Sequence, residues 1–295
     1  MKGLSEDVLD LLEQLAPVQL PKASLPKTRA SEKGLRRDVV VGDFHFPLAD
    51  ERVVSILLQV IRDWGPNGIT LNGDLPDMLQ LGKYIKDFRT RWPLSRERAE
   101  MQRFLLQLHE AAPANARIVE TNANHSGNSS ESRWWRFLSE RLGELSDLPE
   151  VGAALDYRKI WHPQEPWNRV EVVDSNTITK GLVALHGTIV RSKAAYSAMA
   201  MLEKYRANLI HGHTHRMGST GYRVPAVGQQ RAHQMRALEG GCACRLEAPY
   251  GDAHNWQQGF VLVLSSPDGH WSAEQVLVQE GRAIVTTLGK EYRAE

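Results

Sequence analysis

Residues 38–44 read DVVVGDF, a short run of β-branched residues that ends in a polar turn. A stretch with helical periodicity follows it, from Asp50 to Trp64. β-Branched residues favour strands, so this segment predicts a strand followed by a helix. We expect further strands at 68–74, 116–124, 181–187 and 207–213, and further helices at 77–91, 95–111, 130–144 and 191–205. Strands that alternate with helices predict a layered α/β fold with buried sheets.

The two ends of the chain depart from this alternation. After residue 215 we expect strands without helices, in GYRVPA (221–226), MRALEGGCACRL (235–246), QGFVLVLSS (258–266) and AEQVLVQEG (273–281). Apolar residues at helical spacing from Leu4 to Leu15 predict a short helix, and the stretch after it, which contains several prolines and lysines, predicts a flexible linker. We therefore expect an N-terminal helix and linker at 1–37, either packed on the domain or available to a partner, and one domain at 38–295.

Composition narrows the class of protein. The chain has 295 residues, 42% hydrophobic and 24% charged, with a net charge of +1, so any attraction to polyanions must come from a local patch. Its two cysteines, Cys242 and Cys244, are too few for a disulfide framework. The N-terminus has acidic residues where a signal peptide needs an apolar run, and no stretch approaches the roughly 18 apolar residues of a membrane span. We expect a cytoplasmic protein without a membrane partner, and the oligomeric state stays open.

Side chains with metal-binding chemistry follow the five predicted strands. The strand ends carry Asp43-Phe44-His45, Gly73-Asp74-Leu75-Pro76-Asp77, Asn122-Ala123-Asn124-His125, His186-Gly187 and His211-Gly212-His213-Thr214-His215. Because ligands bind beyond the carboxyl ends of parallel strands, we expect these groups to meet at one rim. Carboxylate and amide oxygens favour manganese or magnesium, and imidazole extends the range to zinc, iron and nickel. Two metals about 3.5–4 Å apart, bridged by a carboxylate, are used for phosphoester displacement.

The motifs DFH, GDLPD, NANH, LHG and HGHTH, in this order, resemble the five signature blocks of the calcineurin-like metallophosphoesterases. Those blocks are D-x-H, G-D-x-x-D, G-N-H, H and G-H-x-H, and the resemblance covers residues 43–215. It implies a four-layer α-β-β-α sandwich with two facing mixed β-sheets and metals at one edge. The later stretches Cys242-Ala243-Cys244 and HNWQQGF (254–260) resemble members encoded by phages and prophages, some associated by name with DNA repair nucleases.

The resemblance also implies a cofactor and a role for each matching residue. It implies two divalent metal ions, with Mn²⁺ expected and Mg²⁺, Fe²⁺, Ni²⁺ or Zn²⁺ as alternatives. One ion would be held by Asp43, His45 and His215, the other by Asn124, His186 and His213, and Asp74 would bridge them. His125 would approach the phosphoryl oxygen or leaving group, and Asp77 would orient it. Ala123 stands where the family usually has glycine, so a left-handed backbone there would carry a cost.

The predicted reaction is hydrolysis of a phosphoester by a hydroxide that the metals activate. His125 would protonate the leaving alkoxide, which matters most for diesters and alkyl esters. We therefore expect a phosphodiesterase or nuclease-like enzyme acting on nucleic acid (DNA or RNA) or nucleotides. A phosphomonoesterase, such as a protein phosphatase, is the alternative, and a non-catalytic scaffold on the same fold is a third. Scaffold members typically lose metal ligands, whereas every implied ligand is present here.

Two basic stretches are candidates for substrate contacts. Residues 83–103 are rich in lysine and arginine, and Arg133-Trp134-Trp135-Arg136 places two arginines beside two indoles. Basic side chains next to aromatic rings suit a groove that binds a single strand, with Arg133 and Arg136 contacting the substrate. The alternative is a solvated helix face with Trp134 or Trp135 anchored in the core.

The remaining cysteines and histidines have less context. Cys242 and Cys244 could bind a metal, but two thiols without a nearby His or Cys partner are more often core residues. We expect His211 to be a neighbour of the site and not a ligand. The other histidines, expected to be ordinary surface or core residues, are His109, His162, His233, His254 and His270.

Overall fold

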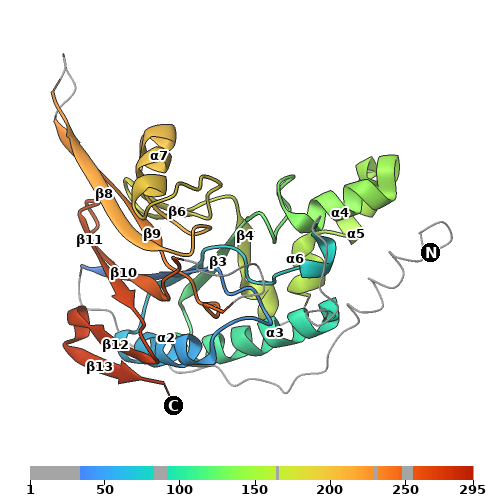
Figure 1. Ribbon diagram of the computed structural model, residues 1–295, viewed down its shortest axis with the longest axis horizontal. Helices are drawn as coiled ribbons and strands as arrows, with labels where there is room; N and C mark the ends of the chain where they lie inside the picture. Colours follow the sequence, from blue (N-terminus) through green and yellow to red (C-terminus); the bar gives the residue numbers. More distant parts are fainter. Residues whose placement is uncertain are drawn as a thin grey trace.

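A computed structural model describes residues 34–82, 92–163, 166–226, 228, 232–247 and 255–294 (Figure 1). The helix and most of the linker expected at 1–37 lie outside these residues, as do residues 83–91 of the first basic stretch and His254. Within them, two β-sheets form the centre of the fold.

The first sheet has six strands in the order β11-β10-β1-β2-β3-β4. They are β1 (Arg36–Val41), β2 (Gly68–Leu71), β3 (Arg117–Thr121), β4 (Glu171–Val173), β10 (Gly259–Ser265) and β11 (Trp271–Leu277). Strands β1 to β4 run parallel, whereas β10 and β11 join antiparallel. The carboxyl ends of β1, β2 and β3 therefore lie at the same edge.

The second sheet has five strands in the order β5-β6-β7-β9-β8. They are β5 (Asn176–Thr179), β6 (Leu182–Leu185), β7 (Asn208–His211), β8 (Met217–Val224) and β9 (His233–Gly240). Strands β6, β7 and β9 are parallel, and β5 and β8 pair antiparallel at the two edges. The carboxyl ends of β6 and β7 therefore also share an edge.

Alternating side chains divide the fold into four layers. In β1, Val40 packs in the core between the sheets, while Val39 and Val41 pack against helices on the outer side of the first sheet. In β7, Ile210 belongs to the same central core, while Leu209 packs towards α7 (Tyr196–Tyr205). This period-two pattern is what a sheet buried on both faces requires. The predicted four-layer α-β-β-α sandwich with two mixed sheets is confirmed.

The helices cover the outer faces, as Figure 1 shows for α2 (Glu51–Trp64) and α3 (Leu94–Ala111) below the first sheet and α7 beside the second. Helix α2 starts where the Asp50 carboxylate accepts a hydrogen bond from the backbone N–H of Arg52, and it ends at Gly65, whose φ is 60°. The remaining α-helices and strands of the described residues are α4 (Arg133–Leu142), α5 (Pro149–Ala154), α6 (Tyr157–Trp161) and the hairpin β12 (Arg282–Val285) with β13 (Lys290–Arg293). Among the described residues, no helix combines the length and apolarity needed to cross a membrane.

Several boundaries differ from the sequence expectations. The predicted strand at 38–44 stops at Val41 and the one at 68–74 stops at Leu71, because the chain turns just beyond them and Asp43 and Asp74 adopt positive φ. Of the helix predicted at 77–91, the structure describes only residues 77–82, and these contain one 3₁₀ turn, Leu79–Leu81. Unpredicted elements are the short strands β4, β5, β12 and β13 and the short helices α5 and α6.

Candidate metal centre

Polar side chains from both sheets converge beyond the carboxyl ends of β1, β2, β3, β6 and β7. The structure brings together all seven predicted metal ligands, which are Asp43, His45, Asp74, Asn124, His186, His213 and His215, and it places His125 and Asp77 beside them. All but Asn124 and His213, which are partly buried, are buried. The expectation that strand ends deliver these groups to one rim therefore agrees with the geometry.

One cluster consists of Asp43, His45 and His215. Nε2 of His215 lies 3.1 Å from Oδ1 of Asp43 and 3.0 Å from Nε2 of His45. Nε2 of His45 is 3.9 Å from the same Asp43 oxygen. Three potential donor atoms thus face a common point.

A second cluster consists of Asp74, His186 and His213, with Asn124 next to it. Nε2 of His186 lies 3.2 Å from Oδ2 of Asp74 and 2.9 Å from Oδ1 of Asn124. The rings of His186 and His213 meet edge to face, with centroids 5.2 Å apart.

Asp74 lies between the clusters. Its Oδ2 is 3.2 Å from Nε2 of His186 in one cluster and 3.9 Å from Nε2 of His45 in the other. Its Oδ1 accepts a hydrogen bond of 3.0 Å from the backbone N–H of His125. A single carboxylate therefore reaches both clusters, as expected of a bridging ligand.

The histidine tautomers suit metal binding. Nδ1 of His186 donates to the carbonyl oxygen of Asn72 at 2.8 Å, and Nδ1 of His45 donates to Oδ1 of Asp77 at 3.0 Å. Each ring then presents an Nε2 lone pair to the centre, which is how oriented histidine ligands bind metals. Sequence reasoning did not single out Asn72, because a backbone carbonyl leaves no signal in residue type.

Charge in the centre favours a bound cation. Burial raises the pKa of Asp74, but His125 and His186 outweigh it and hold the pKa well below its usual range. Burial lowers the pKa of His186, but the carboxylates of Asp74 and Asp43 raise it to about 9. Without a cation, a proton must therefore lie between His186 and Asp74. The donor set of carboxylates, imidazoles and an amide fits two borderline divalent ions.

The backbone of the centre is bent at the predicted ligands themselves. Asp43, His45, Asp74, His213 and His215 all have positive φ, between 50° and 70°. Non-glycine residues rarely adopt this conformation, and such residues concentrate at functional sites. Ala123, in contrast, is not left-handed, so the cost expected at this position does not arise.

Two glycines allow the close packing around these residues. A Cβ on Gly212 would lie 2.6 Å from Oδ2 of Asp43, and one on Gly73 would lie 2.6 Å from Nδ1 of His186. Side chains at these positions would displace the neighbouring groups.

Asp77, the residue predicted to orient His125, contacts it through its backbone carbonyl as well as through its carboxylate. Nδ1 of His125 donates to the Asp77 carbonyl oxygen at 2.7 Å and lies 3.3 Å from Asp77 Oδ1. That carboxylate is nearer to His45, so Asp77 contacts both histidines. Burial raises the pKa of Asp77, but its hydrogen bonds to His125 and His45 outweigh this and lower the pKa.

A pocket of about 190 Å³ opens beside Asn124. Its lining residues are Leu81, Gly82, Asn124, Arg133, Arg136, Phe137 and Glu140. Nη1 of Arg133 donates to the Asp77 carbonyl oxygen at 2.8 Å, and Arg136 makes a longer bond, of 3.4 Å, to the carbonyl of Ser132. Both predicted substrate-binding arginines therefore lie next to the centre.

Other expectations for this region are only partly met. Trp134 is fully buried against Trp161, which confirms the core alternative for this indole. In the first basic stretch, Arg98 is also buried, so that stretch is not simply a solvated face. His162 is a buried core residue whose Nε2 lies 2.7 Å from Oε2 of Glu120.

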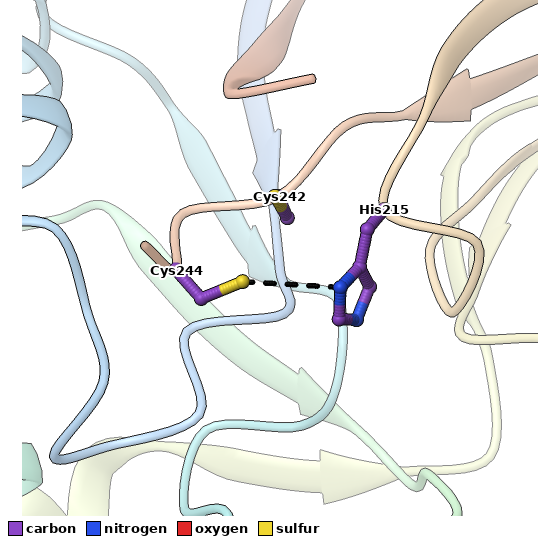
Figure 2. Close-up of side chains that lie close together, drawn as sticks. All are labelled: His215, Cys242 and Cys244. Atoms are coloured by element: carbon purple, nitrogen blue, oxygen red, sulfur yellow. Dashed lines mark hydrogen bonds between the residues drawn. The ribbon is translucent and has the colours of Figure 1, made fainter. Parts of the chain in front are cut away.

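Cys242 and Cys244 are buried and unpaired, as expected of core residues. The premise that no histidine lies near them is wrong, since Sγ of Cys244 is 3.8 Å from Nδ1 of His215 (Figure 2). A hydrogen bond with Cys242, together with burial, raises the pKa of Cys244 well above its usual value. Nδ1 of His211 faces the carbonyl oxygen of Gly212, and this histidine belongs to none of the four clusters of metal-binding side chains in the described part of the chain.

No family model matches the chain. It is 26% identical over 264 residues to the Gene 54 protein of Mycobacterium phage D29, covering 85% of this chain and 96% of the relative. It is 25% identical over 262 residues to the Gene 54 protein of Mycobacterium phage L5, with the same shares covered. Neither name states an activity.

Solved structures with a similar course of the chain include Vps29 from Entamoeba histolytica complexed with Zn²⁺ (TM-score 0.38, 16% identity, 82% of this chain and 98% of that one). Vacuolar protein sorting 29 from Cryptosporidium parvum has a TM-score of 0.45 at 11% identity, over 88% of this chain and 100% of that one. Nuclease MPE from Pseudomonas putida has a TM-score of 0.30 at 13% identity, over 76% of this chain and 84% of that one. None of these similarities assigns an activity to this chain, so its chemistry is inferred from the geometry of the centre.

Proposed function

We propose that this protein is a metal-dependent phosphoesterase with two divalent ions in its centre, most suited to phosphodiesters of nucleic acid or nucleotides. The observation that carries the proposal is the position of Asp74 Oδ2, within 3.9 Å of an imidazole Nε2 in each of two clusters. A carboxylate shared by two nitrogen- and oxygen-rich clusters is the arrangement of two-metal phosphoesterases.

Each predicted ligand has a position that supports its role. One ion would be held by Asp43, His45 and His215, the other by Asn124, His186 and His213, and both by Asp74. When bound, the ions would neutralise the phosphoester charge and supply hydroxide at neutral pH. Mn²⁺ is the expected species because the ligands mix carboxylate and amide oxygens with imidazoles; Mg²⁺, Fe²⁺, Ni²⁺ and Zn²⁺ are alternatives.

His125 is the proposed general acid. Its Nδ1 donates to Asp77, so its Nε2 is left to face the centre, 3.9 Å from Oδ2 of Asp74. The Asp77 carboxylate, 3.3 Å from Nδ1, helps to hold the ring in this orientation. The ring can then donate its Nε2 proton to the oxygen of a departing alkoxide.

The pocket beside Asn124 supports an anionic substrate. Arg133 and Arg136 both line it, and guanidinium groups bind phosphate oxygens through paired N–H donors. A phosphate next to the scissile one would therefore be held there. This favours a nucleic acid or nucleotide over a phosphorylated protein, the alternative substrate.

Hydrolysis of bis-p-nitrophenyl phosphate and p-nitrophenyl phosphate with added Mn²⁺ tests the reaction class. We expect the diester to be hydrolysed faster than the monoester. A preference for the monoester would indicate a phosphatase. Absence of turnover with each of Mn²⁺, Mg²⁺, Fe²⁺, Ni²⁺ and Zn²⁺ would contradict the proposal and leave a non-catalytic scaffold.

His125→Ala tests the acid with two leaving groups. For a diester with an alkyl leaving group, kcat should fall by about 10²–10⁴, the usual contribution of a general acid. The loss should be much smaller for the p-nitrophenyl ester, because p-nitrophenolate leaves without a proton. Bound metal should be retained, and His270→Ala, at a largely exposed histidine, is the control. Equal losses on both esters would assign His125 a role other than acid.

A further inference from the structure

A second group of metal-binding side chains lies behind the centre, on the far side of His215. The Sγ atoms of Cys242 and Cys244 and one ring nitrogen of His215 all lie within 4.8 Å of one another, and all three residues are buried. Figure 2 shows the Cys244 sulfur facing Nδ1 of His215, at 3.8 Å, with Cys242 alongside. The proposed phosphoesterase reaction uses neither thiol.

Backbone hydrogen bonds hold the two cysteines in place. Between them, the N–H of Ala243 donates to the carbonyl oxygens of Gly42 (3.1 Å) and of the predicted ligand Asp43 (3.2 Å). Cys242 pairs with the segment that follows Trp256: its N–H donates to the carbonyl of Gln257 at 3.1 Å, and its carbonyl accepts from Gly259 at 3.0 Å. The segment that carries the thiols is therefore held by backbone hydrogen bonds and isolated β-bridges.

The conspicuous NWQQG sequence contributes to this framework. The N–H of Gln257 donates to the carbonyl of His215 at 2.7 Å, and Nε2 of Gln258 donates to the carbonyl of Cys244 at 2.8 Å. Adjacent glutamines thus fix the histidine and one of the cysteines relative to each other. The Gln258 side chain thus has a role here that the two-metal reaction does not require.

The chemistry of the three atoms differs from that of the centre. Thiolates select soft or borderline ions such as Zn²⁺, Cd²⁺ and Cu⁺, whereas carboxylate oxygens suit Mn²⁺ and Mg²⁺. With Zn–S near 2.3 Å and Zn–N near 2.0–2.1 Å, neighbouring ligand atoms of a tetrahedral site lie about 3.5–3.8 Å apart. The separation of 3.8 Å between Cys244 Sγ and His215 Nδ1 exceeds the sulfur–nitrogen spacing of such a site, about 3.5–3.6 Å, by only a few tenths of an ångström.

We propose that Cys242, Cys244 and Nδ1 of His215 form a separate binding site for a soft or borderline metal ion of the Zn²⁺ class. Nδ1 of His215 faces this site, while its Nε2, 3.1 Å from Asp43, faces the two-metal centre. Binding replaces the thiol protons, which pass to solvent. If the proposed two-metal centre were also filled, His215 would ligate through both ring nitrogens and its imidazole proton would pass to solvent with the thiol protons.

Titration of the full-length protein with Cd²⁺ alone tests the site, with ultraviolet absorption from thiolate-to-metal charge transfer as the signal. The chain has only two cysteines, so every such signal comes from these thiols. Ions in the two-metal centre have oxygen and nitrogen ligands and produce no thiolate band. We expect the band to saturate once this site and the two positions of the centre are filled, in a buffer whose reductant carries no thiol.

Variants separate this site from the centre. Each of Cys242→Ser and Cys244→Ser should remove about half of the band, because its intensity follows the number of thiolates. The double variant should remove it completely, whereas Asp74→Asn should retain it. A wild-type protein with no band, or a double variant that keeps it, overturns the proposal. In the wild-type protein, an intact Cd²⁺ band without any Mn²⁺-dependent hydrolysis would instead count against the phosphoesterase and leave the thiolate site standing.

Discussion

Nε2 of His45 lies 3.0 Å from Nε2 of His215, although the two residues are 170 positions apart and follow strands of different sheets. Nδ1 of His45 donates to Asp77, so its Nε2 carries a lone pair directed at the other ring. Two such nitrogens at this distance require a proton or a cation between them. Since Oδ1 of Asp43 lies 3.1 Å from His215 Nε2, a cation suits the same position.

Asp74→Asn should affect both proposed metals. The substitution preserves shape but removes the charge of the carboxylate that reaches both clusters. We expect Mn²⁺-dependent hydrolysis to fall by more than about 100-fold, beyond the usual effect of losing an outer-shell partner. The metal content of the purified variant should fall below the two ions per chain proposed for the wild type. Asp268→Asn, at an exposed aspartate, is the matched control. Full activity in Asp74→Asn would contradict the proposal that Asp74 bridges the two metals.

Gly212→Ala should disturb the centre although it replaces none of the proposed ligands. Its Cβ would lie 2.6 Å from Oδ2 of Asp43 and 3.2 Å from Nδ1 of His186. The carboxylate must move, so we expect about 10–100-fold weaker Mn²⁺ binding, measured by titration calorimetry. Gly240→Ala is the control, because its Cβ meets nothing closer than 3.4 Å. Equal Mn²⁺ affinity in both variants would show that the close approach is not needed.

Glu97 should make stability depend on pH. Its carboxylate accepts from the N–H of Met78 (2.6 Å) and from Nε1 of Trp92 (2.8 Å), but burial and the nearby Asp77 charge raise its pKa to about 8 from the ordinary 4.5. Between these two values the folded protein binds more protons than the unfolded chain. This group's contribution to the free energy of unfolding is therefore fully present below about pH 4.5 and is lost as pH rises through 8.

Urea unfolding of wild type and Glu97→Gln across pH 5–8.5 measures this contribution. The wild-type free energy of unfolding should fall more steeply with pH than that of the variant, which cannot ionise. Glu100→Gln, on the same helix and ion-paired with Arg96, is the control. Parallel pH profiles for Glu97→Gln and wild type would mean that Glu97 is already ionised when the protein is folded.

Arg136→Ala should weaken substrate binding more than the chemical step. Its guanidinium lines the pocket beside Asn124 but is not among the predicted metal ligands. We expect KM for a short oligonucleotide to rise about tenfold, the value of one charge-assisted hydrogen bond, with kcat changed little. The salt dependence of binding should also become shallower. Arg141→Ala, farther along α4 and outside the pocket, is the control, and an identical response there would indicate a general charge effect.

Local sequence was enough to predict the framework of the fold. Runs such as VVV before Asp43 and ITL before Gly73 have the composition of buried strands, and α2 has the periodicity and Asp50 cap of a helix. The five strand ends with metal-binding residues followed from these runs, because parallel strands end at one edge. The elements β4 and α5 were missed because both are short and neither contains a buried residue, so neither has the apolar run or the periodicity of a core element.

Sequence by itself determined which residue types stand at the strand ends, and hence that a metal centre was to be expected. Only the tertiary structure decided which atoms meet. The Asn72 carbonyl reaches His186 across 114 positions, and Cys244 reaches His215 across 29. Such contacts depend on how two sheets pack face to face and on left-handed residues such as Asp43 and Asp74. The packing of the sheets and the left-handed turns leave no periodic pattern in the sequence, because they depend on contacts between segments that are distant along the chain.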